Sequence, residues 1–164
     1  IAEMIMGKTS RIVYFILSLV FFVLFDEYFS NQILERIYLI PENSLFDIVF
    51  VQNQGAAFNI LQGSKIFLIG FSVFALVCIA FYTIKHIKTA PMIAVYSSAL
   101  LCSGIFCNMY ERILYGYVRD YIKLNFIDFP VFNISDIFIN VSVFVIVVII
   151  IRKNFTKNNE VNNR

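Results

Sequence analysis

The sequence is poor in charged residues, which make up 15% of its 164 positions, whereas hydrophobic residues make up 60%. A soluble domain of this length can bury a core with far less apolar content, so the excess has to face lipid. The formal net charge is only +2, which does not suggest a phosphate-binding surface. The composition therefore predicts an integral membrane protein.

Cysteine and histidine are also scarce. Cys78, Cys102 and Cys107 lie in apolar runs, and no two of them form a C-x-x-C pair. We interpret all three as small buried hydrophobic residues, which argues against a disulfide-generating oxidoreductase. The single histidine, His86, lies in a short basic loop, so the sequence predicts no metal site and no cofactor.

The N-terminal region does not have the features of a cleavable signal peptide. Its apolar run lacks a small-x-small cleavage site and reaches the acidic pair Asp26 and Glu27 instead. Because the sequence begins with Ile1, we expect Met4 or Met6 to be the natural start. No internal repeat is evident.

Four segments are long and apolar enough to cross a bilayer as helices, which takes about 20 residues each. They are Ile12–Phe29, Ile66–Ile84, Pro91–Tyr110 and Ile134–Ile151. The last segment is rich in β-branched residues, which would favour a strand in water, but its length and lack of turn signals favour a helix in lipid. The sequence thus predicts an all-α membrane protein with four transmembrane helices.

Basic residues predict the orientation of these helices. They lie before the first span, between the second and third, and after the fourth: Lys8, Arg11, Lys85, Lys88, Arg152, Lys153 and Lys157. These places fall on one side of the membrane, so we expect both termini to be cytoplasmic. Residues 1–153 would form a single membrane domain, and the polar residues 154–164 a disordered cytoplasmic tail.

The two long connections, Ser30–Lys65 and Glu111–Asn133, then lie at the outer face. Alternation of apolar and polar residues in Phe46–Val51 and in Tyr115–Ile122 predicts short strands at the membrane surface. These connections hold most of the acidic residues and nearly all the turn-forming residues of the chain.

Polar residues inside apolar spans are costly, so each needs an explanation. Gly104, Asn108 and Arg112 recur every four residues and share one helix face. Helix packing through a small residue, together with an interfacial arginine, explains this pattern as well as a functional role does. Asp26 is either a carboxylate that snorkels to the outer interface or part of a site.

Two further aspartates lie near the outer ends of the third and fourth spans. Asp136 opens the fourth span, where Asn133 could cap the helix and the helix dipole favours an ionised carboxylate. The plain alternative is an acidic first-turn residue without function. Asp120 lies in the loop that joins the outer end of the third span to the outer end of the fourth. Because both ends lie at the same membrane face, we expect Asp120 to meet Asp136.

Four motifs together carry a family resemblance. They are Asn-x-Gly-Ala-Ala-Phe at Asn53–Phe58, Gly-x-x-x-Asn-x-x-acid-Arg at Gly104–Arg112, Gly-Tyr-Val-x-Asp at Gly116–Asp120, and Phe-Pro-x-Phe-Asn-x-x-Asp at Phe129–Asp136. Each motif is weak alone. In this order, across nearly the whole membrane core, the set resembles the lipoprotein signal peptidases (signal peptidase II).

The resemblance implies an aspartic endopeptidase of the bacterial inner membrane, with Asp120 and Asp136 as its catalytic pair near the outer face. It implies supporting or substrate-binding roles, without metal or cofactor, for Asn53, Gly55, Gly104, Asn108, Arg112, Asn133 and Asp26. The outer loops would form a small extracytoplasmic β-cradle and a short, mobile periplasmic helix over the site.

The resemblance also implies the substrate, a prolipoprotein that already carries diacylglycerol on a cysteine, with cleavage just before that cysteine. Membrane lipid is the other expected partner, nucleic acid is not expected, and we expect a monomer. Three positions depart from the family pattern: Ser30 replaces a common lysine, Glu111 an aspartate, and Ser135 an alanine. None of them is one of the two catalytic positions.

Other classes of membrane protein fit less well. A small transporter or channel subunit is the main alternative, but the inner halves of the second and fourth spans are almost wholly apolar and offer no polar pathway. An intramembrane serine protease would need a histidine near the outer polar cluster. A pure assembly protein would leave the two aspartates and Asn108–Arg112 without a role.

Overall fold

The computed structural model describes residues 7–41, 45–55 and 63–162, with side chains described up to residue 155. Met4, Met6 and the Ala56–Phe58 part of the first motif lie outside the described residues, so what the sequence predicts for them stays a prediction.

Four long helices dominate the fold: α2 (Lys8–Glu35), α3 (Lys65–His86), α4 (Met92–Tyr115) and α5 (Ile134–Asn162). Each contains an apolar stretch long enough to cross a membrane. The four predicted spans are therefore confirmed, and the helices mostly extend beyond the predicted ends. The protein is a multi-pass membrane protein.

Helix α4 lies at the centre of the bundle and packs against α2, α3 and α5. Half of its most apolar window is buried, compared with 11% of the corresponding window in each of the other helices. The outward surfaces of α2, α3 and α5 consequently remain apolar and unpacked, as a lipid environment requires.

This arrangement corrects one prediction about the cysteines. Cys102 and Cys107 on the central helix α4 are buried as predicted, but Cys78 on α3 is exposed. The sequence interpretation was wrong for Cys78 because an apolar residue on a membrane helix can face lipid instead of a protein core.

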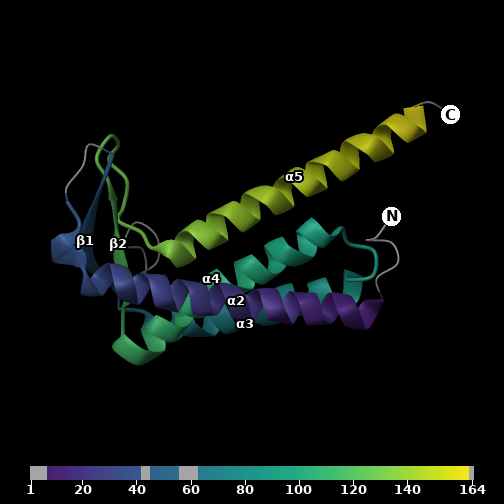
Figure 1. Cartoon of the computed structure of the whole chain (residues 1–164). Helices are drawn as coiled ribbons and strands as arrows, with labels where there is room; N and C mark the ends of the chain where they lie inside the picture. The colour runs from purple at the N-terminus through teal and green to yellow at the C-terminus, as the bar shows by residue number, and fades with distance from the viewer. Residues whose placement is uncertain (1–6, 42–44, 56–62, 163–164) are drawn as a thin grey trace.

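A two-stranded antiparallel sheet covers one end of the bundle (Figure 1). Strand β1 (Phe46–Asn53) pairs with β2 (Val118–Leu124), with a register shift between Ile48 and Val51. Both predicted strands are confirmed, although β2 starts later than predicted. The reason is that α4 runs on to Tyr115 and ends at Gly116, whose φ of 87° turns the chain into β2.

The predicted short helix over the site is only partly described. The first long connection contains one 3-10 turn, η1 (Ile37–Leu39), and residues 42–44 and 56–62 of this connection lie outside the described residues. A longer helix in this connection stays a prediction.

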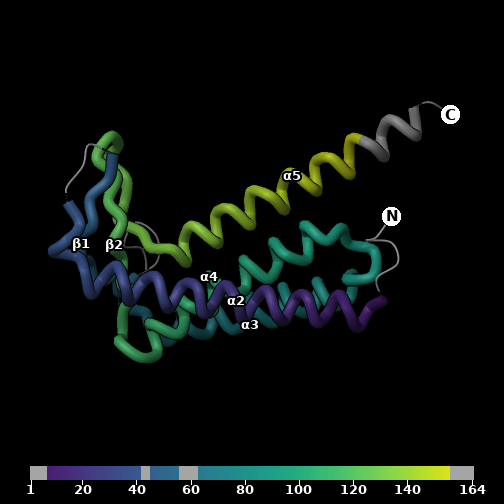
Figure 2. The backbone as a smooth tube through the Cα atoms, in the orientation of Figure 1, coloured from purple at the N-terminus to yellow at the C-terminus, as the bar shows by residue number. Residues whose placement is uncertain are grey.

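The chain termini lie at the end of the bundle opposite the sheet, together with the α3–α4 connection (Figures 1 and 2). Arg11 is buried there and donates hydrogen bonds to the carbonyl oxygens of Ile87 at 2.9 Å and Ala90 at 2.6 Å. This arginine therefore attaches the α3–α4 connection to the first turn of α2.

Helix α5 continues to Asn162, through a stretch for which the sequence predicts a disordered tail. A helix that is already nucleated extends by adding one hydrogen bond per residue and needs no packing partner to do so. A division between a membrane domain, 1–153, and a separate tail, 154–164, stays a prediction.

Gly104 brings α4 and α5 into close contact at the sheet end. A Cβ atom at this position would lie 2.5 Å from the Ser135 carbonyl oxygen and 2.9 Å from Ile139 Cγ1. Real Cβ atoms do not approach backbone oxygen this closely, so a glycine is required. The small residue therefore sets the distance between α4 and the first turns of α5.

We expect Gly104→Ala to destabilise the protein by about 1–3 kcal/mol, because the added methyl group forces α5 away from α4. The measurement is thermal unfolding in detergent. Gly70→Ala on α3 is the matched control, since a Cβ there meets nothing within 4 Å. A Gly104→Ala protein as stable as the control would contradict this account of the α4–α5 contact.

Candidate active site

A cavity of about 700 Å³ lies at the sheet end of the bundle, between the strands, α4 and the start of α5. Its lining combines an apolar wall, mostly from the β2–α5 connection and α5, with a compact polar group. That polar group contains five of the residues singled out in the sequence: Asn53, Asn108, Arg112, Asp120 and Asp136.

Asp120 reaches the cavity from β2 and is 2% exposed. The β1–β2 pairing places it opposite Val51, so Asn53 lies two residues along the neighbouring strand. The Asn53 side chain donates from Nδ2 to Asp120 Oδ2 at 2.9 Å. The other oxygen, Oδ1, accepts from Asn133 Nδ2 at 3.0 Å. Both oxygens of this carboxyl group are thus held by side-chain amides.

Asp136 reaches the cavity from the first turn of α5. The Asp136 N–H donates to Asn133 Oδ1 at 2.9 Å, and the Asn133 N–H donates to Asp136 Oδ2 at 3.2 Å. This reciprocal arrangement is a capping box, so the predicted cap by Asn133 is confirmed. Asn108 Nδ2 donates to Asp136 Oδ1 at 2.9 Å. The fold therefore holds the Asp136 carboxyl group from both α4 and its own helix cap.

Asn133 is the residue that joins the two carboxyl groups. Its Nδ2 donates to Asp120 and also to Asn108 Oδ1, at 3.0 Å in each case, while its Oδ1 and backbone N–H bind Asp136. Asn133 is 4% exposed, so this amide is shielded from water. The structure thus brings Asp120 and Asp136 to one cavity, as the sequence predicts, and it also shows that Asn133 binds both residues.

Arg112 supplies a positive charge beside the two carboxyl groups. Its guanidinium donates to the carbonyl oxygen of Asn108 at 3.0 Å and to that of Gly55 at 2.7 Å. The Gly55 N–H in turn donates to Asn53 Oδ1 at 2.9 Å, which fixes the amide that holds Asp120. Within the third-span motif, Gly104 sets the helix packing, whereas Asn108 and Arg112 reach the cavity.

The pKa of Asp120 is raised to about 7 from an ordinary value of 3.8. Burial is the main cause, and the hydrogen bond from Asn53 opposes it. The nearby charge of Asp136 raises the pKa further, because two close carboxylates repel each other. The surroundings of Asp120 therefore allow the Asp120–Asp136 pair to keep one proton near neutral pH.

Asp26 lies away from the cavity. It is 4% exposed on α2, so the interpretation as a snorkelling interfacial carboxylate is wrong. The polar side chains next to it are Cys107 on α4 and Ser135 on α5, while its Oδ1 atom is buried without a hydrogen-bond partner among the described residues. Asp26 therefore belongs to the contact of α2 with α4 and α5, behind the first turn that carries Asp136.

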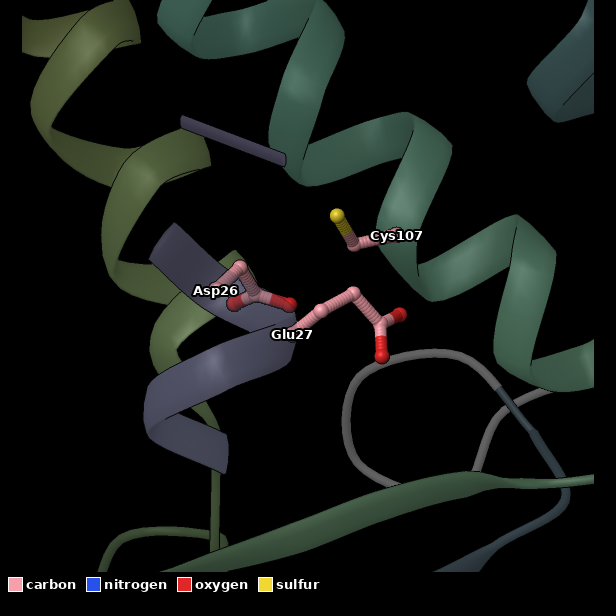
Figure 3. A group of neighbouring side chains, drawn as sticks. All are labelled: Asp26, Glu27 and Cys107. Atoms are coloured by element: carbon pink, nitrogen blue, oxygen red, sulfur yellow. The ribbon is translucent and has the colours of Figure 1, made fainter. Parts of the chain in front are cut away.

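Asp26, Glu27 and Cys107 form a group with metal-binding atom types within 4.8 Å of one another (Figure 3). Of these residues, Asp26 and Cys107 are buried, and Glu27 lies 4.0 Å from the Arg119 guanidinium. The two carboxylates and thiol are chemically able to bind a divalent cation. The absence of a metal site stays a prediction.

Sequence reasoning missed the ion pair that fixes the start of β2. Glu111 accepts from the Arg119 backbone N–H at 2.7 Å and from Arg119 Nε at 2.7 Å. The same guanidinium donates to Asn31 Oδ1 at 2.9 Å. Glu111 is one of the departures from the family pattern, and its longer side chain lets it hold the residue that precedes Asp120. The two charged residues lie eight positions apart, one on α4 and one on β2, with a turn between them. Helix or strand periodicity in the sequence therefore cannot reveal this pair.

Comparisons with known proteins agree with the motifs. A family model described as signal peptidase (SPase) II matches residues 12–152. A lipoprotein signal peptidase of Streptococcus thermophilus is 34% identical over 73% of this chain and 74% of that protein. One from Streptococcus pyogenes is 31% identical over 82% of this chain and 90% of that protein.

A solved structure described as a bacterial membrane enzyme has the same fold. It is 27% identical and matches with a TM-score of 0.76, covering 89% of this chain and 92% of that one. A second structure of a bacterial membrane enzyme matches with a TM-score of 0.68 at 28% identity.

We expect Asp120 to lower the stability of the folded protein as pH rises from about 4 to about 7. In this window the folded state keeps a proton on Asp120 that the unfolded chain has released, because the folded pKa is about 7 and the ordinary value 3.8. The stabilising contribution is fully present below the lower value and is lost above the higher one. The measurement is the unfolding midpoint of wild type and Asp120→Asn from pH 4 to pH 8. Identical slopes for the two proteins would contradict the raised pKa.

Proposed function

The chain belongs to the signal peptidase II family, and from this premise we propose that Asp120 and Asp136 are its catalytic pair. Its activity is that of a lipoprotein signal peptidase, an aspartic peptidase that cleaves the signal peptides of prolipoproteins. The observation that carries the proposal is the position of Asn133 beside one cavity, where its side-chain Nδ2 donates to the Asp120 carboxyl group and its backbone N–H donates to the Asp136 carboxyl group.

The proposed chemistry uses one proton shared by the pair. Two carboxyl groups in one site do not both ionise readily, so one is protonated and the other is charged. The charged group takes a proton from a water molecule as that water attacks the scissile carbonyl carbon. The protonated group donates to the carbonyl oxygen, and a proton later passes to the leaving amine.

The amide groups around the pair suit this chemistry. Asn53, Asn108 and Asn133 donate hydrogen bonds to the carboxyl oxygens and take no proton themselves. Each carboxyl oxygen can accept more than one hydrogen bond, which leaves capacity for a water molecule from the cavity. Arg112 lines the same cavity, where its charge would stabilise the negative charge that develops on the carbonyl oxygen.

We propose that the substrate carries diacylglycerol on the cysteine that follows the cleaved bond. The cavity supports this proposal, because its lining continues from Asp136 along α5 to Ile137, Ile139 and Val141. These residues belong to a helix that packs against α4 near its start but whose most apolar window is only 11% buried, so that most of its surface would face lipid. Acyl chains of the substrate would then stay in the bilayer while the peptide reaches the carboxyl pair.

The proposed orientation puts this cavity near the outer face of the bacterial inner membrane, with both termini in the cytoplasm. Support comes from the basic residues at the opposite end of the bundle, next to the termini and the α3–α4 connection (Figure 1). We also propose that the protein acts as a monomer, because the two aspartates and the side chains that bind them all belong to a single chain. A transporter is set aside because the family is a peptidase family.

We predict that Asp120→Asn and Asp136→Asn each abolish cleavage of a diacylglyceryl-prolipoprotein and leave the fold intact. An asparagine keeps the shape and one acceptor oxygen of the carboxyl group, although its NH2 group cannot accept the second hydrogen bond, and it can neither share the proton nor act as a base. The measurement is a cleavage assay in detergent or lipid, with thermal unfolding of each variant alongside. The unlipidated prolipoprotein, run in parallel, is expected to be cleaved far more slowly.

Asp128→Asn is the matched control for this assay, because Asp128 is an exposed aspartate in the same β2–α5 connection. It should cleave at the wild-type rate. Normal turnover by a well-folded Asp136→Asn or Asp120→Asn protein would refute the catalytic pair. Equal rates for the lipidated and unlipidated substrates would refute only the proposed role of the diacylglycerol.

A further inference from the structure

The hydroxyl group of Tyr121 lies at a buried junction of three elements. Tyr121 on β2 is 0% exposed, and Ser30 on α2 is 3% exposed. The phenol oxygen lies 2.7 Å from Ser30 Oγ and accepts the N–H of Ile134, the first residue of α5, at 3.3 Å. Neither Tyr121 nor Ser30 lines the cavity. The two hydroxyl groups thus connect α2, β2 and α5 from behind the active site.

This junction holds the two segments that carry the aspartates. Tyr121 directly follows Asp120, and Ile134 comes two residues before Asp136. The backbone already joins these segments at Phe132. Its carbonyl oxygen accepts from the N–H groups of Tyr121 and Ile122 at 3.0 and 2.8 Å, and its N–H donates to the Ile122 carbonyl oxygen at 3.1 Å. The Asn133 side chain adds its bond to Asp120 in the cavity, and the phenol adds a bond to the helix itself, behind the cavity. The phenol therefore restricts rotation of the first turn of α5 against β2 at a point that the other contacts do not hold.

The phenol also meets a requirement of the helix start. The first N–H groups of an α-helix have no partner within the helix. Asn133 Oδ1 accepts from Asp136, and the Tyr121 oxygen accepts from Ile134. Burial raises the pKa of Tyr121, so the phenol stays protonated and keeps a hydrogen to share with Ser30.

We propose that Tyr121 is a positioning residue for the reaction. Together with Ser30, its hydroxyl group fixes the first turn of α5 against β2 and so fixes Asp136 relative to Asp120. The inference rests on the proposed function of the two aspartates. The family commonly has lysine at the position of Ser30. In this chain the Ser30 hydroxyl group, paired with that of Tyr121, occupies the position of the lysine side chain.

The test is Tyr121→Phe, which keeps the ring and removes only the hydroxyl group. We expect kcat to fall by about 10- to 100-fold, with KM within about twofold, because small misplacements of catalytic groups have effects of this size. The alkaline limb of the kcat–pH profile should move to lower pH. If the two aspartates are held less closely, the charge of Asp136 raises the pKa of Asp120 less, and Asp120 loses its proton at a lower pH. A smaller fraction of folded protein would lower the rate at every pH and would not shift the profile.

Further variants separate positioning from stability. Ser30→Ala should lower kcat in the same direction, and Ser30→Thr, which restores a hydroxyl, should recover it. Tyr110→Phe removes an exposed phenol from α4, and Ser142→Ala removes a buried hydroxyl that bonds only to carbonyl groups of its own helix. Both controls should keep the wild-type kcat and pH profile. Unfolding midpoints are measured for every variant.

Wild-type kcat and an unchanged pH profile in Tyr121→Phe, beside inactive Asp120→Asn and Asp136→Asn, would overturn the positioning role and leave the catalytic pair standing. Activity in either aspartate variant would overturn the catalytic pair instead. If Tyr121→Phe does not fold, the Ser30 variants decide. Equal kcat values for wild type, Ser30→Ala and Ser30→Thr would overturn the proposal.

Discussion

The site depends on one buried residue, Asn133, which binds two carboxyl groups, one on β2 through its side chain and one on α5 through its backbone N–H. Its oxygen and backbone N–H hold Asp136 through the cap of α5, and its nitrogen holds Asp120 on β2. An asparagine can do this because it carries both an acceptor and two donors. Bringing two carboxyl groups together is unfavourable, so the surrounding amide groups and Arg112 have to offset their repulsion within a buried site.

The rest of the fold places the elements that meet at this amide. Gly104 sets the distance between α4 and α5, and the Glu111–Arg119 ion pair fixes the beginning of β2. Since α4 is the packed centre and the other helices face lipid, polar groups are concentrated where α4 emerges at the sheet end. The proposed active site is therefore at the boundary between the apolar helix bundle and the two-stranded sheet. Under the proposed function, water reaches it from the sheet side and a lipid-anchored peptide reaches it from the bilayer.

Much of this could be predicted from the sequence. The length of the apolar runs predicts the four helices, and the spacing of Asn108 and Arg112 predicts a shared face. The contacts that depend on tertiary structure could not be predicted. Asp26 looks interfacial in sequence but is buried, because α4 and α5 cover it. Cys78 looks buried but faces outward. The Tyr121 junction joins residues 91 positions apart, for which a single sequence carries no signal.

The most direct test of the account is the rate of single-turnover cleavage by Asn133→Ala. This change removes the side-chain amide that binds Asp120 and caps α5 but retains both aspartates and the backbone N–H that binds Asp136. The lost helix cap costs about 1 kcal/mol of folding stability, and the buried oxygens of Asp120 and Asn108 that lose a donor add to this cost. The account predicts a folded protein that cleaves the diacylglyceryl-prolipoprotein at least about 100-fold more slowly than wild type. A folded Asn133→Ala protein that cleaves at the wild-type rate would contradict it, because the side chain that connects Asp120 to the cap of α5 would then not be needed for catalysis.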